Sequence, residues 1–259
     1  MQRKSDQWNP TIYHQCSQMQ FAVAKQFINQ SLFSGTEQAL DIGCGDGKTS
    51  LYLAKKVAQG RLLAIDRSAK MIEFSKKHYQ HKNLSYQLMD AQYLSLIDCF
   101  DVITSFFCLP WIQNKQDTFH NMARCLRPKG KILLITTFFS EQQKALIYQI
   151  IKKPYWRPYF RNHPDPFDRL NDLNYAYYAF CSGIQLTSSV KEAIQYTFPD
   201  PETLKKFFTL LIPHTHYLEE TAKQQAFVED IYKSYQQICT CNGNTIDFKI
   251  IKMIGYKDH

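Results

Sequence analysis

Short apolar runs alternate with amphipathic stretches through the first half of the chain. The runs end in turn residues and predict strands, whereas the stretches between them repeat apolar residues at helical spacing. Strands are expected at residues 38–42, 61–66, 84–89, 100–107 and 131–137, and helices at 48–57, 68–79 and 116–126. This alternation predicts an α/β fold with a doubly wound, mostly parallel sheet, whose ligand lies at the carboxyl ends of the strands.

The flanking regions add further elements. Residues 19–28 predict a helix, and Gln20 lies beside its apolar stripe, where an exposed glutamine is expected. Residues 154–166 are dense in prolines and aromatics, which excludes a regular helix or a central strand there. The remaining pattern predicts helices at 144–152, 168–180, 201–211 and 218–239, a strand or hairpin at 184–198, and a final strand at 245–256. The sheet is therefore expected to have seven strands.

Three of the nine glycines fall in one turn directly after the first strand, in Asp41-Ile-Gly43-Cys-Gly45-Asp-Gly47. Glycine tolerates φ > 0 and lets a ligand approach the backbone, and a helix that opens there aims free N–H groups at the turn. A dinucleotide fingerprint would need a glycine where Lys48 stands, so the spacing speaks against it. The carboxylate of Asp41 suits an amine-bearing ligand. The alternative is a glycine-rich turn with no ligand.

Two more acids follow strands. Asp66 comes after the glycine turn at the separation at which a carboxylate binds a ribose hydroxyl pair. Because neighbouring strand ends are about 5 Å apart, Gly45 and Asp66 can hold two ends of one nucleoside. The alternative for Asp66 is a helix N-cap, which Ser68 could also provide. Asp90 follows the third strand, but Asp is common at such turns.

Composition narrows the function classes. The net charge of +8 permits an acidic partner such as RNA, a membrane surface or a carboxylate, but no block of five basic residues supports nucleic acid, and a solvated basic surface is the alternative. The eight cysteines include no C-x-x-C pair, and only Cys239 and Cys241 lie close together, so we expect no metal site and reduced thiols in the cytoplasm. The N-terminus lacks the apolar region of a signal peptide, and apolar runs such as 132–139 are too short to span a bilayer.

Taken in order, these motifs resemble those of class I S-adenosylmethionine-dependent methyltransferases. The resemblance is carried by Leu40–Gly47, Ala64–Asp66 with Met71, Phe100–Gln113 and Leu126–Gly130. It implies the Rossmann-like fold of that family, S-adenosyl-L-methionine as cofactor and S-adenosyl-L-homocysteine as product. The cofactor site expected from the resemblance comprises Tyr13, Asp41, Gly43, Cys44, Gly45, Asp66, Arg67, Met71, Asp90, Ala91, Ser105 and Phe106.

A narrower resemblance concerns the methyl acceptor. The motif Trp8-Asn-Pro-x-x-Tyr13 is similar to the N-terminal start of trans-aconitate methyltransferases. The Tyr13–Gln20 helix start, the Ser105–Trp111 run and the C-terminal third resemble insect juvenile hormone acid methyltransferases. Both groups methylate carboxylates of small molecules, and Gln20 and Trp111 match the glutamine and tryptophan that line the substrate carboxylate. Pro110 departs from the pattern, which usually has a histidine there.

The resemblance implies a small-molecule carboxylic acid with an apolar portion as acceptor. Such an acid is already ionised at pH 7, so it needs donors such as the Gln20 amide and the Trp111 indole rather than a base. An amine or phenol would need a base, for which His14 and His163 are the candidates, although each is expected at the surface. The run Ser105-Phe-Phe-Cys108 differs from the Asn/Asp-Pro-Pro-Tyr/Phe run of base N-methyltransferases, so nucleic acid is not the expected partner. The alternatives are an RNA or protein methyltransferase and a non-catalytic protein that binds the cofactor.

The expected organisation is a single methyltransferase domain over residues 1–259. An N-terminal helix within 1–36 covers the cofactor site, residues 37–140 form the cofactor-binding core, 141–183 form a cap insertion, and 184–259 complete the sheet and the substrate pocket. Within the cap, the aromatic segment 155–160 is either a lid over the apolar tail or core packing. Arg157 and Arg161 are either a second anion anchor or exposed arginines.

Overall fold

The computed structural model describes residue 6, residues 8–238 and residues 243–258, so Cys239 and Cys241 lie outside the described residues. The strands are β1 (Gln38–Ile42), β2 (Arg61–Asp66), β3 (Leu84–Leu88), β4 (Phe100–Phe106), β5 (Leu126–Phe138), β6 (Ile184–Thr197) and β7 (Thr245–Lys257). The α-helices are α1 (Pro10–Cys16), α2 (Gln18–Gln30), α3 (Lys48–Lys56), α4 (Ala69–His78), α5 (Lys115–Cys125), α6 (Glu141–Ile151), α7 (Arg157–Phe160), α8 (Pro166–Leu170), α9 (Tyr175–Cys181), α10 (Pro201–Leu211) and α11 (Thr221–Ile238). Short 3-10 helices are η1 (Ala91–Tyr93), η2 (Leu109–Trp111) and η3 (Pro213–Tyr217).

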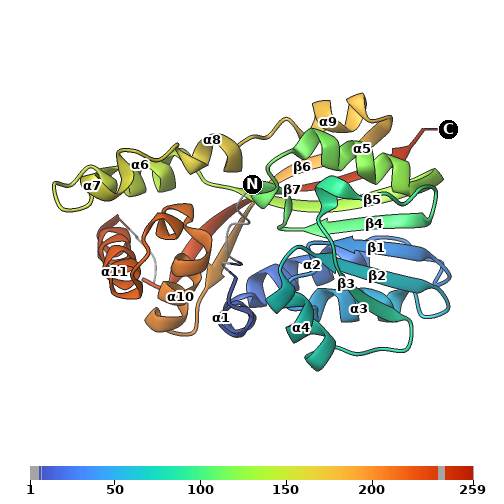
Figure 1. Cartoon of the computed structure of the whole chain (residues 1–259), viewed down its shortest axis with the longest axis horizontal. Helices are drawn as coiled ribbons and strands as arrows, with labels where there is room; N and C mark the ends of the chain where they lie inside the picture. Colours follow the sequence, from blue (N-terminus) through green and yellow to red (C-terminus); the bar gives the residue numbers. More distant parts are fainter. Residues whose placement is uncertain (1–5, 7, 239–242, 259) are drawn as a thin grey trace. The chain divides into compact units, whose positions relative to one another are not determined.

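The strands form one seven-stranded sheet in the order β3-β2-β1-β4-β5-β7-β6 (Figure 1). Strands β1 to β5 pair in parallel. Strands β6 and β7 run antiparallel, because Phe198 N bonds to Asn244 O near one end and Asp258 N bonds to Gly183 O near the other. The predicted doubly wound, mostly parallel α/β fold is confirmed.

The chain divides into two units, which we describe separately. Unit 1 consists of Met1–Thr137, Leu173–Glu192 and Ile250–His259, and unit 2 of Phe138–Asp172 and Ala193–Lys249. The expected single-domain organisation, with its cap at 141–183, stays a prediction. No helix in the described part of the chain is long and apolar enough to cross a membrane.

In unit 1 the order of the strands decides where the site can lie. The chain passes from β1 outward to β2 and β3, then returns to β4 on the other side of β1. Right-handed crossovers place α3 and α4 on one face of the sheet and α5 on the opposite face. The switch point between β1 and β4 opens a crevice at the carboxyl ends of these strands. The glycine turn after β1 lies at that crevice.

One predicted boundary in unit 1 was wrong. Residues 127–130, expected as a turn before a strand, lie inside β5 as a bulge: Phe100 pairs with Leu126 and Val102 with Lys131, and Lys129 has φ +63°. The helix predicted over residues 19–28 is confirmed as α2, and Ser17 separates it from the shorter helix α1.

The helix predicted over 168–180 was also wrong, since α8 and α9 are separate. The Asn171 side chain ends α8: its Oδ1 accepts from Phe139 N at 3.1 Å and its Nδ2 donates to Phe139 O at 2.8 Å. These two bonds between the Asn171 side chain and the Phe139 backbone hold Asn171 in place, and the chain leaves the helix there.

Unit 2 has an aromatic core built from the proline-rich segment and the later helices. Trp156 and Phe160 are buried, and their rings lie 5.1 and 5.0 Å from Phe227. The indole N–H of Trp156 donates to Asp230 at 2.8 Å. Within residues 154–165 only the single turn α7 is helical, and α8 begins at Pro166, so no regular helix spans this segment, as expected from its prolines. These two aromatics therefore serve core packing, and the lid stays a prediction.

His214 is buried in the same core, against Phe160 and Phe167. Within the described residues its Nδ1 has no hydrogen-bond partner. Burial lowers the pKa of His214 from 6.5 to about 4, although the nearby Asp165 carboxylate opposes the shift. The imidazole is therefore neutral in the folded protein at neutral pH.

This burial makes the stability of unit 2 depend on pH. Because the unfolded chain takes up a proton near pH 6.5 and the folded chain only near pH 4, the free energy of unfolding should fall as the pH drops between these values, by about 3 kcal/mol in total. Urea denaturation at neutral pH and at about pH 5 should show a smaller acid loss in His214→Gln than in the wild type. His78→Gln, at an exposed position, is the control. An unchanged acid loss in His214→Gln would contradict the assignment.

Candidate functional site

The glycine turn between β1 and α3 is held in a left-handed conformation. Gly43, Gly45 and Gly47 have φ values of +74°, +54° and +86°, which other residues adopt only with strain. The amides of Gly43 and Cys44 both donate to Ile65 O, at 2.8 and 3.0 Å. These bonds attach the turn to the end of β2.

Asp41 lies beneath this turn as a buried carboxylate. Its Oδ2 accepts from Ser50 Oγ at 2.6 Å, and its Oδ1 accepts from Thr104 Oγ1 at 2.8 Å. Burial raises the pKa of Asp41, while the two hydroxyl donors lower it. Since a carboxylate has about four lone-pair positions, Asp41 keeps capacity for a further donor.

Asp66 connects the turn to the next helix. Its Oδ2 accepts from Gly45 N at 3.0 Å, and its Oδ1 accepts from Ser68 N at 2.9 Å. Burial raises the pKa of Asp66, and these two donors and the Arg67 charge oppose the shift. The N-cap of α4 is Ser68, whose Oγ accepts from Met71 N. The Asp66 carboxylate is therefore fixed beside the glycine turn and does not cap the helix.

A pocket of about 380 Å³, counting space open to solvent, lies over the turn. Side chains at helical spacing on α1 and α2 form one wall. The aromatic end of β4 and the residue after it form another. The lining residues are Tyr13, Ser17, Gln20, Phe21, Asp41, Gly43, Cys44, Asp46, Thr49, Phe106 and Phe107.

Gln20 is the unusual member of this lining. The sequence predicts an exposed glutamine, and this is wrong: Gln20 is only 7% exposed, because its face of α2 covers the glycine turn. Its Oε1 has no hydrogen-bond partner within the described residues. Leaving a buried amide oxygen unpaired costs about 1–3 kcal/mol. Gln20 thus offers an unused polar group to whatever enters the pocket.

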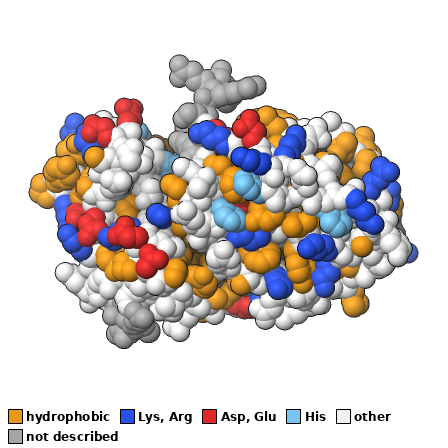
Figure 2. Space-filling model, turned by 90° about the horizontal axis from the view of Figure 1, so that it is seen from below, with side chains coloured by type: hydrophobic (Ala, Val, Ile, Leu, Met, Phe, Trp, Pro, Cys, Tyr) orange, Lys and Arg blue, Asp and Glu red, His pale blue; other side chains and the backbone are white. Residues whose placement is uncertain are grey.

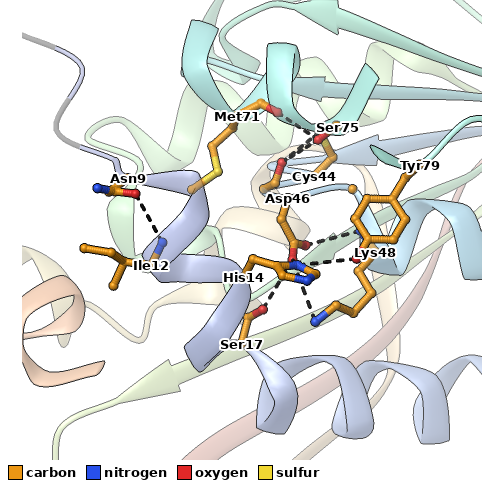
Figure 3. A network of polar contacts seen from close by, with 12 residues as sticks. Asn9, Ile12, His14, Ser17, Cys44, Asp46, Lys48, Met71, Ser75 and Tyr79 are labelled. Carbon is orange, nitrogen blue, oxygen red and sulfur yellow. Dashed lines mark hydrogen bonds and ion pairs between the residues drawn. The ribbon is translucent and has the colours of Figure 1, made fainter. Parts of the chain in front are cut away.

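A polar network ties α1 to the glycine turn through Asp46 (Figure 3). Asp46 Oδ2 lies 2.8 Å from His14 Nδ1 and accepts from Ser17 Oγ at 3.4 Å, and Oδ1 accepts from Lys48 N at 3.2 Å. Tyr79 OH lies 3.3 Å from the same His14 nitrogen. This network keeps α1, and with it Tyr13, against the turn.

Burial shifts the pKa values of two groups in this network. It lowers the pKa of Lys48, and the nearby Asp46 opposes that shift. It raises the pKa of Tyr79, and Asp46 adds to that shift. The His14 side chain is 36% exposed, in keeping with the surface histidine that the sequence suggested, and it also takes part in this hydrogen-bonded cluster.

Aromatic rings extend the site toward the N-terminus. Trp8 contacts Trp111 edge to face, with ring centroids 5.3 Å apart, and Tyr13 at 6.0 Å. Upstream of Trp8, the Asp6 carboxylate accepts from Ser68 Oγ at 2.7 Å, which joins this segment to the start of α4. Burial raises the pKa of Tyr13, and the carboxylates of Asp46 and Asp66 add to the shift, so its hydroxyl stays protonated.

The pocket brings together six of the fourteen predicted site residues: Tyr13, Gln20, Asp41, Gly43, Cys44 and Phe106. Gly45 and Asp66 adjoin it through their mutual hydrogen bond. The other six, Arg67, Met71, Asp90, Ala91, Ser105 and Trp111, are not among the lining residues. Ser105 instead donates to Ile42 O across the sheet, and Asp90 accepts from Gln92 N at the start of η1.

Sequence reasoning missed five lining residues: Ser17, Phe21, Asp46, Thr49 and Phe107. Helical spacing from Tyr13 to Ser17 and Phe21 could have indicated the first two. Asp46 could have been suspected from its place between two glycines. Phe107 gave no such signal, because its φ of +62° depends on the tertiary structure.

Comparison with known proteins shows the family to which this chain belongs. Residues 40–134 match the model described as "Methyltransferase domain". The chain is 33% identical over 248 residues to "Putative methyltransferase 235L" of Invertebrate iridescent virus 6, which covers 96% of this chain and 92% of the relative. It is 28% identical over 155 residues to the juvenile hormone acid O-methyltransferase of Drosophila melanogaster, covering 55% of this chain and 52% of that enzyme.

The fold also has solved counterparts. The crystal structure of BH2331 from Bacillus halodurans C-125, titled as a putative methyltransferase, aligns with a TM-score of 0.64 and 16% identity. The alignment covers 92% of this chain and all of that one. At this identity the likeness shows the fold alone.

The site geometry predicts the effect of removing one support of Asp41. Thr104→Val is nearly isosteric but leaves Asp41 Oδ1 without its donor at a fully buried position. The free energy of unfolding, measured in urea, should fall by about 1–3 kcal/mol. Thr104→Ser keeps the donor and loses only a methyl group, so it should cost about 1 kcal/mol or less. Equal stability of the valine variant and the wild type would show that Asp41 does not depend on this bond.

Proposed function

Because the chain belongs to the class I S-adenosylmethionine-dependent methyltransferases, we propose that it methylates the carboxylate of a small molecule with an apolar portion. The observation that carries the acceptor proposal is Gln20, a buried amide whose oxygen has no hydrogen-bond partner among the described residues. It lines a pocket to which Phe21, Phe106 and Phe107 contribute apolar side chains. The cytoplasmic location expected from the sequence stays a prediction.

The residues around the glycine turn fit the methyl donor of this family. Asp66 is held rigidly by two backbone donors, yet its remaining lone pairs can accept from a pair of ribose hydroxyls. A Cβ at Gly45 would lie 3.2 Å from the Tyr13 ring, so glycine leaves room there that a larger residue would fill. We also propose that the same cofactor is contacted by Arg67, Met71, Asp90, Ala91 and Ser105. S-adenosyl-L-methionine supplies an activated methyl group when bound.

To methylate a carboxylate, the protein needs to orient one carboxylate oxygen of the acceptor and does not need to remove a proton from it. The Gln20 amide can turn by about 180°, which exchanges its oxygen and its NH₂ group at the unpaired position. In that orientation the NH₂ group donates to a carboxylate oxygen, and we propose that the Trp111 indole donates from the η2 side. The aromatic wall accommodates the apolar portion and excludes water.

One chemical argument and one comparison favour an acid over other acceptors. A carboxylate is ionised at neutral pH, so no general base is needed. Moreover, the relative from Drosophila melanogaster has a name that gives an acid as its acceptor. The other relevant possibilities are an RNA or protein acceptor, and a protein that binds the cofactor without turnover. Neither of these two possibilities predicts methyl transfer to a panel of small carboxylic acids, whereas our proposal does.

The first test concerns the cofactor. Asp66→Ala should weaken binding of S-adenosyl-L-methionine about tenfold or more in calorimetric titration, because a charged acceptor of two hydroxyls is lost. Asp66→Asn, which keeps an acceptor oxygen, should lose less. Glu73→Gln, which removes an exposed carboxylate from α4, is the control and should bind like the wild type. Unchanged binding in Asp66→Ala would remove Asp66 from the cofactor site.

The second test concerns the acceptor. Release of S-adenosyl-L-homocysteine should occur with apolar carboxylic acids and not with their primary amides. Gln20→Leu should lower kcat/KM about 10-fold or more on such an acid without changing cofactor affinity. Gln20→Glu should be worse than Gln20→Leu, because its charge repels a carboxylate. If Gln20→Glu were the more active variant, an amine or hydroxyl acceptor would replace the acid; cofactor binding with no turnover on any acid would favour the other two possibilities.

A further inference from the structure

The positive charge of this protein is concentrated in one short stretch. Residues 48–82 contain nine Lys and Arg residues and two acids, Asp66 and Glu73, so this stretch carries +7 of the net +8. It comprises α3, β2, α4 and their connections. Figure 2 views the molecule from the side on which α3 and α4 lie in Figure 1, and Lys and Arg side chains are spread over that part of the surface.

Six of these residues lie at one edge of unit 1, which we call the basic edge: Lys55, Lys56, Arg61, Lys76, Lys77 and Lys82. They stand in the last turns of α3 and α4, at the first residue of β2 and just before β3. Because β2 and β3 are parallel and the helices run back across the sheet, these four chain ends meet at the same edge. The candidate site lies at the opposite, carboxyl edge.

Asn83 links the parts of the basic edge. Its Nδ2 donates to the carbonyls of Ala54 and Val57 at 3.1 and 2.7 Å, so the residue after Lys82 is bound to the end of α3. Its backbone carbonyl accepts from Leu62 N at 2.8 Å, which places Lys82 beside Arg61. The clustering of positive charge is therefore built by specific hydrogen bonds.

The charges of the basic edge are not neutralised within the protein. Among the described residues, none of the six side chains makes an ion pair with a carboxylate. Glu73 lies one turn before Lys76 and Lys77. Glu37, near the start of β1, is engaged by the amides of Ser34 and Gly35. Lysines in the last turn of a helix interact favourably with the helix dipole. That effect does not account for the positions of Arg61 and Lys82, which lie outside the helices.

We propose that the basic edge docks the protein on an anionic membrane surface. Clusters of about four to eight basic residues are attracted to acidic lipid headgroups without specific contacts. Five of the six residues are lysines, which act as hydrated point charges, whereas phosphate recognition in nucleic acids favours the arginine fork. Helix C-termini present carbonyls rather than N–H donors to this edge. No large apolar side chain between residues 33 and 87 is exposed in the described structure, so bases would find no stacking platform.

Vesicle sedimentation tests the proposal with the whole 259-residue chain. Vesicles of phosphatidylcholine and phosphatidylserine at about 2:1 should bind it at low salt, where the Debye length is about 30 Å, and release it at high salt, where that length is about 3 Å. Pure phosphatidylcholine vesicles should not bind. The variant Lys55→Gln/Lys56→Gln/Lys76→Gln/Lys77→Gln should bind acidic vesicles more weakly by a factor on the order of several hundred, since each of its four lysines contributes about fivefold.

The matched control removes the same charge from exposed positions elsewhere, as Lys152→Gln/Lys191→Gln/Lys206→Gln/Lys233→Gln. It should keep most of the binding, and both variants should keep the cofactor affinity of the wild type, which shows that they are folded. If the two variants lost vesicle binding equally, net charge rather than the basic edge would account for the binding, and the proposal would be overturned. It would also be overturned by a wild-type protein that ignores acidic vesicles, or by one that binds an RNA duplex at the same salt and no vesicle.

Discussion

The hydrogen bond from the Gly45 amide to the Asp66 carboxylate joins the two parts of the structure on which the site depends. It can form only because three glycines take left-handed backbone angles in succession and bring the turn back over the end of β2. The amides of Gly43 and Cys44 complete this attachment at Ile65. The same turn starts α3 and leaves the space that Tyr13 borders. A side chain at Gly43 would meet Cys108, so the loop after β4 depends on this turn as well.

Three carboxylates surround the turn, and each is stabilised by a different set of donors. Asp41 is bound by two side-chain hydroxyls, Asp66 by two backbone amides, and Asp46 by a hydroxyl, an amide and an imidazole. Burying a charge without such donors is costly, and the raised pKa values of Asp41 and Asp66 show that burial still outweighs their donors. These acceptors are therefore fixed before any ligand arrives, which lowers the cost of ordering them on binding.

The two edges of the sheet in unit 1 have different electrostatic character. The carboxyl edge gathers buried acids and a pocket with an aromatic wall, and the opposite edge gathers exposed lysines on the ends of α3 and α4. This separation follows from chain direction, because parallel strands place all their carboxyl ends together and all their amino ends together. The proposed acceptor pocket and the proposed membrane-docking surface therefore use different residues of the same unit.

The sequence by itself determined the order of strands and helices, the glycine turn, the acid at the end of β2 and the family that these motifs indicate. Such features are local: alternation, helical spacing and glycine spacing express backbone preferences within a few residues. Only the tertiary structure decided that Gln20 is buried with an unpaired oxygen and that His14 meets Asp46, since each depends on packing between segments distant in sequence. It also decided the bulge at 127–130, where strand pairing overrides the local turn preference, and the break at Asn171, where side-chain bonds to a distant backbone segment override the helix preference. The sequence shows how many lysines there are but not that they meet at one edge of the sheet. Their meeting depends on the parallel register of β2 and β3, because strand pairing, and not position along the chain, sets which residues are close in space.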